Sequence, residues 1–553
     1  MSEFFLELFS EEIPAGLQKN LREKIFEDFK NLFEEKLIKS KKSFSFSTPN
    51  RLALVFEDLD KQIKIKSKEI RGPKTSAPEQ ALEGFLRSNK IDKKNLYKKK
   101  TEKDEFYFYK TMATSLKTHD LLTEFIPKIL SNYQWKKSMK WGEFDLNWGR
   151  PLKSILSIFD KKIINFKFHH LTSSNLTFLD KDFEEKKRSF ENFKKYEKFF
   201  EDNGVIVNQN KRLKIINKSF LKILGKKGLK INENPKLMDE VVNLVDSPNV
   251  LLCKFDKKFL SVPKEILTLT MESQQKYFPT FNDKNEITNE FLIVTNKKDK
   301  KGLIKIGNER VVDARLSDAE FFWNKDKSQN LVKKVSGLKS MNFFKGLGTY
   351  FDKVQRMRKL GGLISDELLI SKEKVELSAT ICKTDLISEI VGEFPELQGI
   401  MGGYLSHAQG FDKEIVNAIK EQYLPLGTSS VVPKNPYSIS LSLADKIDSL
   451  TGFFGIDEKP SSSKDPYALR RVALGIIRIL IENKKDIKIN NLFINSLNIY
   501  SNQDLKFSND NVMKDISNFL IDRFKYYCKE KNLRYDIIEA VTNSFDLNKI
   551  GID

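Results

Sequence analysis

The stretch EFPELQGIMGGYLS (393–406), together with SLADKIDSLTGFFGIDEKP (442–460) and SKDPYALRRVALGIIRIL (463–480), decides the fold of the C-terminal half. The residue patterns of all three segments predict helices joined by tight connectors. Acidic residues are concentrated in the first segments and arginines in the last. From Phe344 onward, apolar residues recur at helical spacing and the alternation typical of strands nearly stops. We therefore expect this half of the chain to be an all-α domain.

The last of these segments has its own start signals. Asp465 stands where an N-cap residue belongs, and Pro466 follows at the first helical position. At 100° per residue, Arg471 and Arg478 project away from the apolar face that begins at Leu469. We expect both guanidinium groups in solvent, where they can bind phosphates or a partner's carboxylates. An ordinary solvated helix face is the alternative.

Three carboxylates earlier in the domain share a spacing. Asp385, Glu389 and Glu393 stand at i, i+4 and i+8, which predicts one acidic helix face. Like charges at that spacing repel unless cations cover them. Lysines or arginines of this chain, the docking surface of a partner subunit, or a metal are the possible covers. Cys382 falls within an apolar stripe of the same segment, so we interpret it as a packing residue.

The same region contains a segment similar to part of a metal site. LADKIDSL (443–450) is similar to the terminal segment of HD-type phosphohydrolases, with Asp445 at the ligand position. That ligand set also needs a histidine and a His-Asp dipeptide, and Lys383-Thr384 stands where the dipeptide belongs. We therefore predict an HD-like scaffold with no metal and no catalytic residue.

The N-terminal half predicts mixed α/β structure. Residues 12–37 repeat apolar side chains at helical spacing, and residues 44–59 suggest two short strands that turn at Thr48-Pro49. LKSILSIF (152–159) and NVLLCKF (249–255) are also typical of strands. The expected fold class is a multidomain α+β protein, mixed in its first half and all-α in its second.

Composition narrows the class of protein. The chain has 553 residues and a formal net charge of +20, which favours a polyanionic partner, although an AT-rich coding sequence also enriches lysine. Its three cysteines form no CxxC pair, so they support neither a zinc site nor a disulfide framework. The absence of a long apolar run argues against a membrane span or a signal peptide. We expect a cytoplasmic location.

Basic residues within distinctive motifs are our candidates for RNA contact. GNERVVDARLSDAEFFW (307–323) alternates arginines with acids, which suits an internal ion-pair network as well as RNA. QQKYFP (274–279) sets a lysine beside two aromatic residues that can stack on bases. The candidate set is Arg51, Lys74, Lys140, Arg150, Lys276, Arg310, Arg315, Lys464, Arg470, Arg471 and Arg478.

The motifs, taken in order, resemble one family. Besides those quoted, they are LELFSEEIPA (6–15), STPNRLALVF (47–56), EIRGPK (69–74), MKWG (139–142), RPL (150–152), FLSVPKEIL (259–267) and KGLGTYFDKV (345–354). Together they resemble the β subunit of the bacterial heterotetrameric glycyl-tRNA synthetase, and they extend over almost the whole chain.

The resemblance implies an α2β2 ligase whose α subunit holds ATP and magnesium and makes the adenylate. The β subunit would bind tRNA(Gly), with no cofactor of its own and no DNA or membrane partner. The implied organisation is an N-terminal body segment (1–60), a mixed region with a B3/B4-like module and body (61–343), and an HD-like helical domain without metal ligands (344–480). A helical linker (481–553) would lead toward an anticodon-binding domain.

Two features depart from the family pattern. The sequence ends at SFDLNKIGID, so the anticodon-binding domain is expected to be absent, whether the chain was cut or is naturally short. Asn50 replaces a usual arginine in TPNRLA. Two other functions stay open at this point. One is an HD-type metal-dependent nucleotide phosphohydrolase, and the other is an assembly scaffold that binds no RNA.

Overall fold

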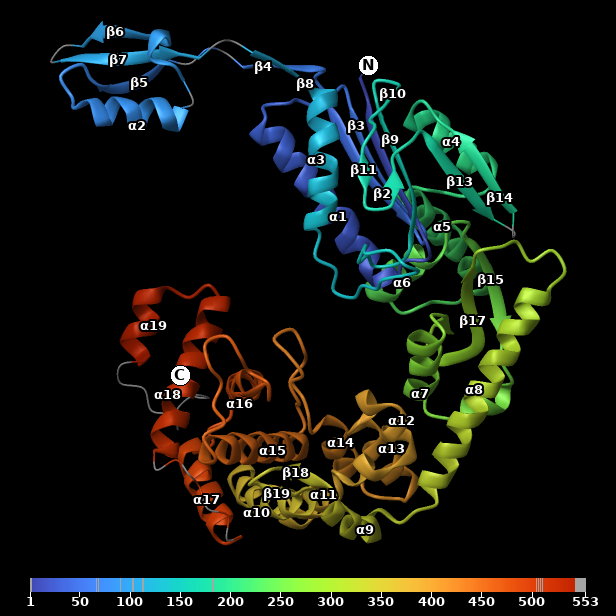
Figure 1. The fold of residues 1–553 in the computed structure, drawn as a ribbon. Helices are drawn as coiled ribbons and strands as arrows, with labels where there is room; N and C mark the ends of the chain where they lie inside the picture. The colour runs from blue at the N-terminus through green and yellow to red at the C-terminus, as the bar shows by residue number, and fades with distance from the viewer. Residues whose placement is uncertain are drawn as a thin grey trace. The chain divides into compact units, whose positions relative to one another are not determined.

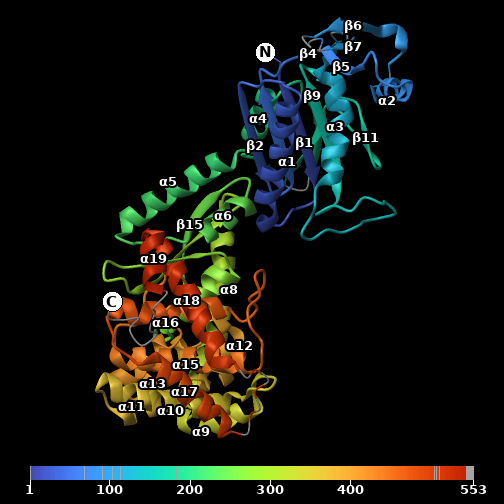
Figure 2. The same ribbon diagram turned by 90° about the vertical axis from the view of Figure 1, so that its left-hand side faces the viewer.

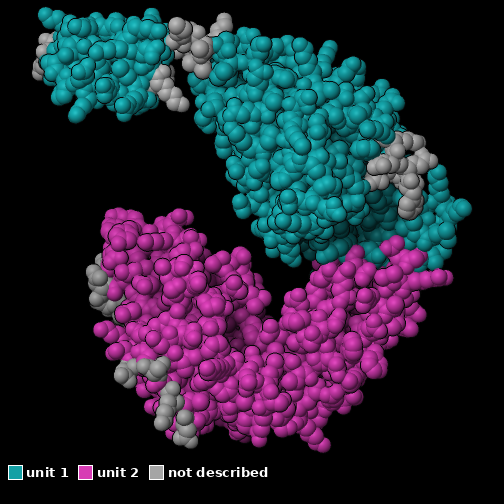
Figure 3. All heavy atoms as spheres, in the orientation of Figure 1, with its two compact units in different colours: residues 1–253, 276–306 teal, residues 254–275, 307–553 magenta. Residues whose placement is uncertain are grey.

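The computed structural model describes residues 2–65, 67, 69–89, 91–101, 104–111, 114–181, 184–503, 505, 507, 509 and 511–542. These residues form two compact units, which are coloured separately in Figure 3. Unit 1 consists of residues 1–253 and 276–306, and unit 2 of residues 254–275 and 307–553. The mixed α/β, multidomain fold class is confirmed. Among the described helices, none is both long and apolar enough to cross a membrane.

Unit 1 is built on an antiparallel sheet of order β10-β9-β1-β3-β2. Its strands are β1 (Phe4–Ser10), β2 (Lys42–Thr48), β3 (Arg51–Glu57), β9 (Leu152–Phe159) and β10 (Lys162–Ile163). The predicted turn at Thr48-Pro49 is confirmed, since β2 pairs with β3 through Thr48 and Arg51.

Both faces of this sheet are buried, because successive side chains point to opposite faces. Phe4, Leu6 and Leu54 pack with α1 (Ala15–Glu35) and α3 (Thr118–Asn132), which lie along the sheet in Figures 1 and 2. Phe5 and Val55 pack on the other face with α4 (Phe193–Asp202). The predicted helix in residues 12–37 is confirmed, and Ile25 and Phe29 on its apolar side are fully buried.

Two smaller substructures complete unit 1. The first is a sheet of order β5-β7-β6 with a helix, joined through the ribbon β4–β8. The second packs two helices with the sheet β15-β17-β16. Their elements are β4 (Gln62–Ile65), β5 (Glu69–Lys74), α2 (Glu79–Asn89), β6 (Leu96–Lys100), β7 (Glu105–Lys110), β8 (Thr114–Lys117), α5 (Gln209–Lys227), α6 (Pro235–Leu244), β15 (Asn249–Lys254), β16 (Phe278–Phe281) and β17 (Ile287–Thr295). The short strands β11 (Lys167–Phe168), β12 (Leu171–Thr172), β13 (Leu176–Lys181) and β14 (Glu184–Ser189) form two further ribbons.

Unit 2 is predominantly helical, as expected from Phe344 onward. Its helices are α7 (Lys264–Leu269), α9 (Leu331–Lys334), α10 (Tyr350–Leu368), α11 (Lys372–Ile381), α12 (Glu389–Glu393), α13 (Ile400–Ala408), α14 (Lys413–Glu421), α15 (Pro436–Gly455), α16 (Leu469–Asn483), α17 (Ile489–Ser501), α18 (Val512–Glu530) and α19 (Tyr535–Thr542). Helix α8 (Leu303–Lys327) begins in unit 1 and continues into unit 2. The small ribbon β18 (Asn342–Phe344) and β19 (Gly348–Thr349) precedes α10. Of the predicted linker 481–553, residues 543–553 lie outside the described part.

Helix α15 is the centre of unit 2. It is buried on nearly every side and contacts α10, α14, α16, α17 and α18. Apolar side chains such as Leu443, Ile447 and Leu450 account for most of this packing. The same helix also buries Asp445, Lys446 and Asp448. Because buried charges are costly unless paired, these three residues require polar or charged partners within unit 2.

Candidate functional site

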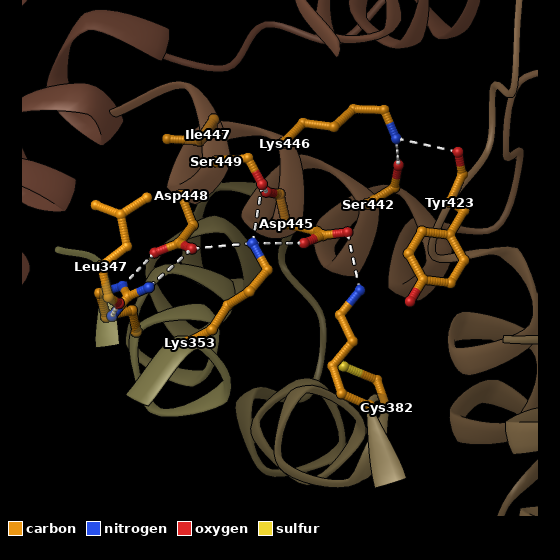
Figure 4. A network of polar contacts seen from close by, with 12 residues as sticks. Leu347, Lys353, Cys382, Tyr423, Ser442, Asp445, Lys446, Ile447, Asp448 and Ser449 are labelled. Atoms are coloured by element: carbon orange, nitrogen blue, oxygen red, sulfur yellow. Dashed lines mark hydrogen bonds and ion pairs between the residues drawn. The ribbon is translucent and has the colours of Figure 1, made fainter. Parts of the chain in front are cut away.

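Two carboxylates on α15 meet two cations on α10. Asp445 and Asp448 are three residues apart, and so are Lys353 and Arg356, so each pair lies on one face of its helix. Lys353 Nζ lies 2.9 Å from Asp445 Oδ1 and 3.0 Å from Asp448 Oδ2, between the two carboxylates in Figure 4. The equal spacings allow each carboxylate of α15 to lie against a cation of α10.

Arg356 holds the second carboxylate from the other side. Its Nε donates to Asp448 Oδ1 at 2.6 Å, and Nη1 donates to Gln503 Oε1 at 2.8 Å. The guanidinium also stacks 4.1 Å from the ring centroid of Tyr500. Both Arg356 and Asp448 are fully buried. This pair fixes α10, α15 and α17 to one another, because Tyr500 belongs to α17.

Lys383 completes the network at the predicted HD-type position. Its Nζ lies 3.0 Å from Asp445 Oδ2 and 4.0 Å from the ring centroid of Tyr423. Burial acts to raise the pKa of Asp445, but the ammonium groups of Lys353 and Lys383 outweigh it and hold that pKa well below its usual range. Each oxygen of Asp445 therefore already has a cationic partner.

This donor set does not fit a metal ion. The residues around Asp445 are lysines, which supply positive charge instead of ligand lone pairs. Among the described residues, no group of three or more histidine, cysteine, aspartate or glutamate side chains could hold a metal ion. Lys353 and Lys383 supply the positive charge beside Asp445 that a metal ion would otherwise supply.

Lys446 lies on the same helix but has no carboxylate of its own. Its Nζ donates to Leu424 O and to Ser442 Oγ, both at 2.8 Å. Burial lowers the pKa of Lys446 to about 7, and the charges of Lys353 and Lys383 act in the same direction against Asp445. The Lys446 side chain is therefore buried among neutral acceptors, and its charge is partly lost near neutral pH.

A cavity of about 520 Å³ opens beside these residues. Asp445, Lys446 and Ser449 of α15 form one wall, and Arg471 and Val472 of α16 form another. The segment from Lys420 to Leu426 closes a third side, and Ile400 adds to its apolar lining. Volume and composition are in the range of small-molecule pockets.

The predicted acidic face on residues 385–393 is wrong. The chain forms a short 3₁₀ turn at Thr384–Ile387 and starts α12 anew, because Ser388 Oγ accepts from Val391 N. Asp385 is fully buried, and its Oδ2 accepts from Gly399 N at 2.5 Å and Gly402 N at 3.0 Å, so it is not available to a docking partner.

The other two acidic candidates are exposed and have partners within the chain. Glu389 lies 2.5 Å from Lys325 Nζ, and Glu393 Oε1 accepts from Gln274 Nε2 at 3.2 Å. Lysine of the same chain is thus the cover for Glu389. Cys382 is fully buried in the core of unit 2, and burial raises the pKa of its thiol to about 12. Its interpretation as a packing residue is confirmed.

Two of the basic candidates are enclosed, although Arg478 was expected in solvent and Arg51 was a candidate for RNA contact. Arg51 is 2% exposed, lies 3.7 Å from Glu7 and stacks between Phe9 and Phe200. Arg478 is 8% exposed, pairs with Glu482 at 2.7 Å and donates to carbonyls of the loop before α15. Both guanidinium groups stabilise the fold and are not surface cations.

The remaining basic candidates divide by their partners. Lys74 pairs with Asp104 at 2.7 Å, and Lys276 pairs with Glu240 at 3.1 Å. Arg150 donates to Gly149 O, and Arg470 donates to Ser461 O. Lys74 is exposed, and so are five further candidates: Lys140, Arg310, Arg315, Lys464 and Arg471.

The start of α16 differs in detail from the prediction. The helix begins at Leu469, four residues after Asp465, and not at Pro466. Asp465 nonetheless caps it, since its carboxylate accepts from Leu469 N at 2.8 Å and Arg470 N at 3.0 Å. Sequence reasoning missed the network of Lys353, Arg356 and Lys383. The matching three-residue spacing of cations in DKVQRM and acids in ADKID was a signal that could have found it.

Fold and site together define a multidomain mixed α/β protein whose helical unit is organised around a buried ion network. A model of the family described as glycyl-tRNA synthetase beta subunit matches residues 4–543. The chain is 38% identical over 554 residues to the glycine–tRNA ligase beta subunit of Rickettsia felis, covering 100% of this chain and 81% of that protein. The corresponding protein of Rickettsia canadensis is 39% identical over 98% of this chain and 80% of its own length. The chain belongs to the glycyl-tRNA synthetase beta subunit family.

Proposed function

We propose that this chain binds tRNA(Gly) and supports glycylation by an α subunit within an α2β2 complex in the cytoplasm. The overall reaction converts ATP, glycine and tRNA(Gly) into glycyl-tRNA, AMP and diphosphate. ATP and magnesium would bind at the α subunit. The observation that carries the proposal is the family match over residues 4–543, supported by relatives whose names state a glycine–tRNA ligase beta subunit.

The two units would have different tasks. In unit 1, the mixed region would contain the B3/B4-like module, and the helices of unit 2 from α10 onward would form the HD-like domain. The charge of +20 and the exposed cations Lys140, Arg310, Arg315, Lys464 and Arg471 support contact with the RNA backbone. The buried lysines on Asp445 give no support to a metal-dependent phosphohydrolase.

The salt dependence of tRNA(Gly) binding tests this proposal on the chain alone. With about five phosphate contacts, affinity should fall roughly 500-fold between 50 and 200 mM salt. The affinity falls because phosphate contacts release counterions. The measurement therefore uses the chain with all its exposed lysines and arginines unmutated. An affinity that does not change across this range contradicts the proposal, and a chain that holds the α subunit without binding tRNA is an assembly scaffold instead.

A further inference from the structure

The cavity beside α15 holds charged groups that the network of Asp445 and Asp448 does not use. Lys446 is 6% exposed, and its ammonium is bonded only to backbone and hydroxyl oxygens. The nearest acid on its helix, Asp445, already contacts two other ammonium groups. Lys446 therefore has no ion-pair partner of its own at this wall, although the cavity lining also includes the carboxylates of Asp445, Glu396 and Glu421.

The fold makes room for this cation. A Cβ atom at Gly475 would lie 2.7 Å from Lys446 Cε, so the glycine leaves space for the lysine stem between α15 and α16. Arg471 lies one helical turn before Gly475 on the same side of α16, and it is exposed at the cavity. Two cations from neighbouring helices thus face one space, with Lys420 on a third side.

The same cavity also offers an acceptor and an apolar surface. Glu421 lines it, and Glu421 Oε2 is buried without a hydrogen-bond partner. A buried acceptor left unbonded is costly, so a donor on a bound molecule would be favoured there. Glu396 adds an exposed acid at the cavity. Apolar side chains form much of the remaining wall: Ile400, Leu424, Pro425, Leu426 and Val472.

We propose that this cavity binds a nucleoside monophosphate without hydrolysing it, as a free nucleotide or as the terminal nucleotide of an RNA strand. The phosphate would lie on the exposed guanidinium of Arg471, which can bind two of its oxygens, with the Lys446 side chain at the adjoining wall. A sugar hydroxyl or base amino group would donate to Glu421, and the base would lie on the apolar wall. The site goes beyond the proposed tRNA-binding function, because it needs neither the α subunit nor a folded tRNA.

Calorimetric titration of the full chain tests the proposal with AMP, UMP, adenosine and inorganic phosphate as probes. We expect saturable binding of AMP and UMP at millimolar concentration or below, at least tenfold tighter than binding of adenosine or phosphate alone. Phosphate that binds as tightly as AMP overturns the proposal, because the apolar wall then contributes nothing. A short single-stranded RNA is the second arm. Binding of the RNA alone assigns the site to an RNA end, and binding of neither RNA nor mononucleotide overturns the proposal.

Two substitutions at the cavity locate the site. Arg471→Ala should weaken AMP binding about tenfold, and Leu426→Glu should weaken it further by placing a like charge at the cavity. Leu426 is 60% exposed, so its replacement leaves folding intact. Arg358→Ala is the matched control, since Arg358 lies exposed on α10 and pairs with Glu376 outside the cavity. AMP affinity unchanged in both cavity variants overturns the proposal, even if tRNA binding is normal.

Discussion

Lys383 Nζ lies 3.0 Å from Asp445 Oδ2, with both side chains buried in the centre of unit 2. This contact argues against a metal site in the helical unit, because the carboxylate has an ammonium partner where the HD-type pattern would place a metal ion. A buried ion pair of this kind contributes little net stability while complete. Removal of one partner leaves an uncompensated buried charge.

Lys383→Met should therefore destabilise unit 2 strongly. We expect a loss of about 3 kcal/mol, because Asp445 keeps only Lys353 as a cationic partner. Thermal unfolding followed by circular dichroism measures the effect. Lys372→Met is the control, since its ion pair with Asp366 is exposed and 3.7 Å long, and should cost less than about 1 kcal/mol. Equal melting temperatures for the two variants would show that the buried contact does not stabilise the unit.

Asp385 gives a pH-dependent prediction with a definite sign. Burial raises its pKa to about 6 from an ordinary value of 3.8, although the amides of Gly399 and Gly402 oppose this. The protonated form is favoured on folding, so this group's contribution is present at low pH and lost as pH rises from about 4 to 6. Asp385→Asn keeps an acceptor and should abolish that loss, which amounts to about 2–3 kcal/mol.

Melting temperatures of the wild type and Asp385→Asn at pH 4.5, 5.5 and 7 measure this difference. Asp385→Ala is the structural comparison, because it leaves the two glycine amides without an acceptor and should destabilise by about 1–3 kcal/mol at every pH. Parallel pH curves for the wild type and the asparagine variant would refute the assignment.

Lys446 predicts that stability rises with pH in a higher pH range, opposite to the loss predicted for Asp385. Its pKa is about 7 in the folded chain, against an ordinary 10.5, so the unfolded chain binds more protons between these values. Stability from this residue should rise between pH 7 and pH 10, by on the order of 3 kcal/mol. Lys446→Met should remove this rise, as measured by chemical denaturation at pH 7, 8 and 9. A variant that keeps the full rise shows that another group causes it.

Substitution of the exposed cations should change the salt dependence of tRNA(Gly) affinity and not the stability of the fold. Arg315→Gln and Lys140→Gln should each reduce the slope of log affinity against log salt for tRNA(Gly) by about 1 if the side chain contacts a phosphate. Arg534→Gln, whose side chain pairs with Asp536, serves as the control. Slopes equal to the wild type in both variants would exclude these two residues from the RNA contact.

Local sequence patterns predicted helices, strands and turns well where the residues of one segment alone determine the structure. The apolar spacing in α1 and the turn at Thr48-Pro49 required no knowledge of distant residues. Arg51 could not be judged in this way, because β3 lies inside a sheet with both faces covered. The acidic spacing of Asp385 and Glu389 was equally misleading, since Ser388 caps a new helix between them.

The candidate site was predictable in part. The sequence singled out Asp445 through a similarity to a metal-ligand position, and the structure places it in buried ion pairs with two lysines. The substitution of Lys383-Thr384 for a His-Asp dipeptide argued against a metal. The partners of Asp445 are Lys353 on α10 and Lys383 just after α11, which are 92 and 62 residues away in sequence. Such pairing depends on how the helices pack together, so the spacing of residues within one helix cannot predict it.

Reconstituted glycylation tests the central claim most directly. Purified α subunit would be assayed for tRNA(Gly) glycylation with and without this chain, and complex formation would be followed by gel filtration. We predict glycyl-tRNA only in the mixture, together with a complex that contains both subunits. Equal activity of the α subunit without this chain, or no complex and no activity in the mixture, would contradict its assignment as the β subunit that delivers tRNA.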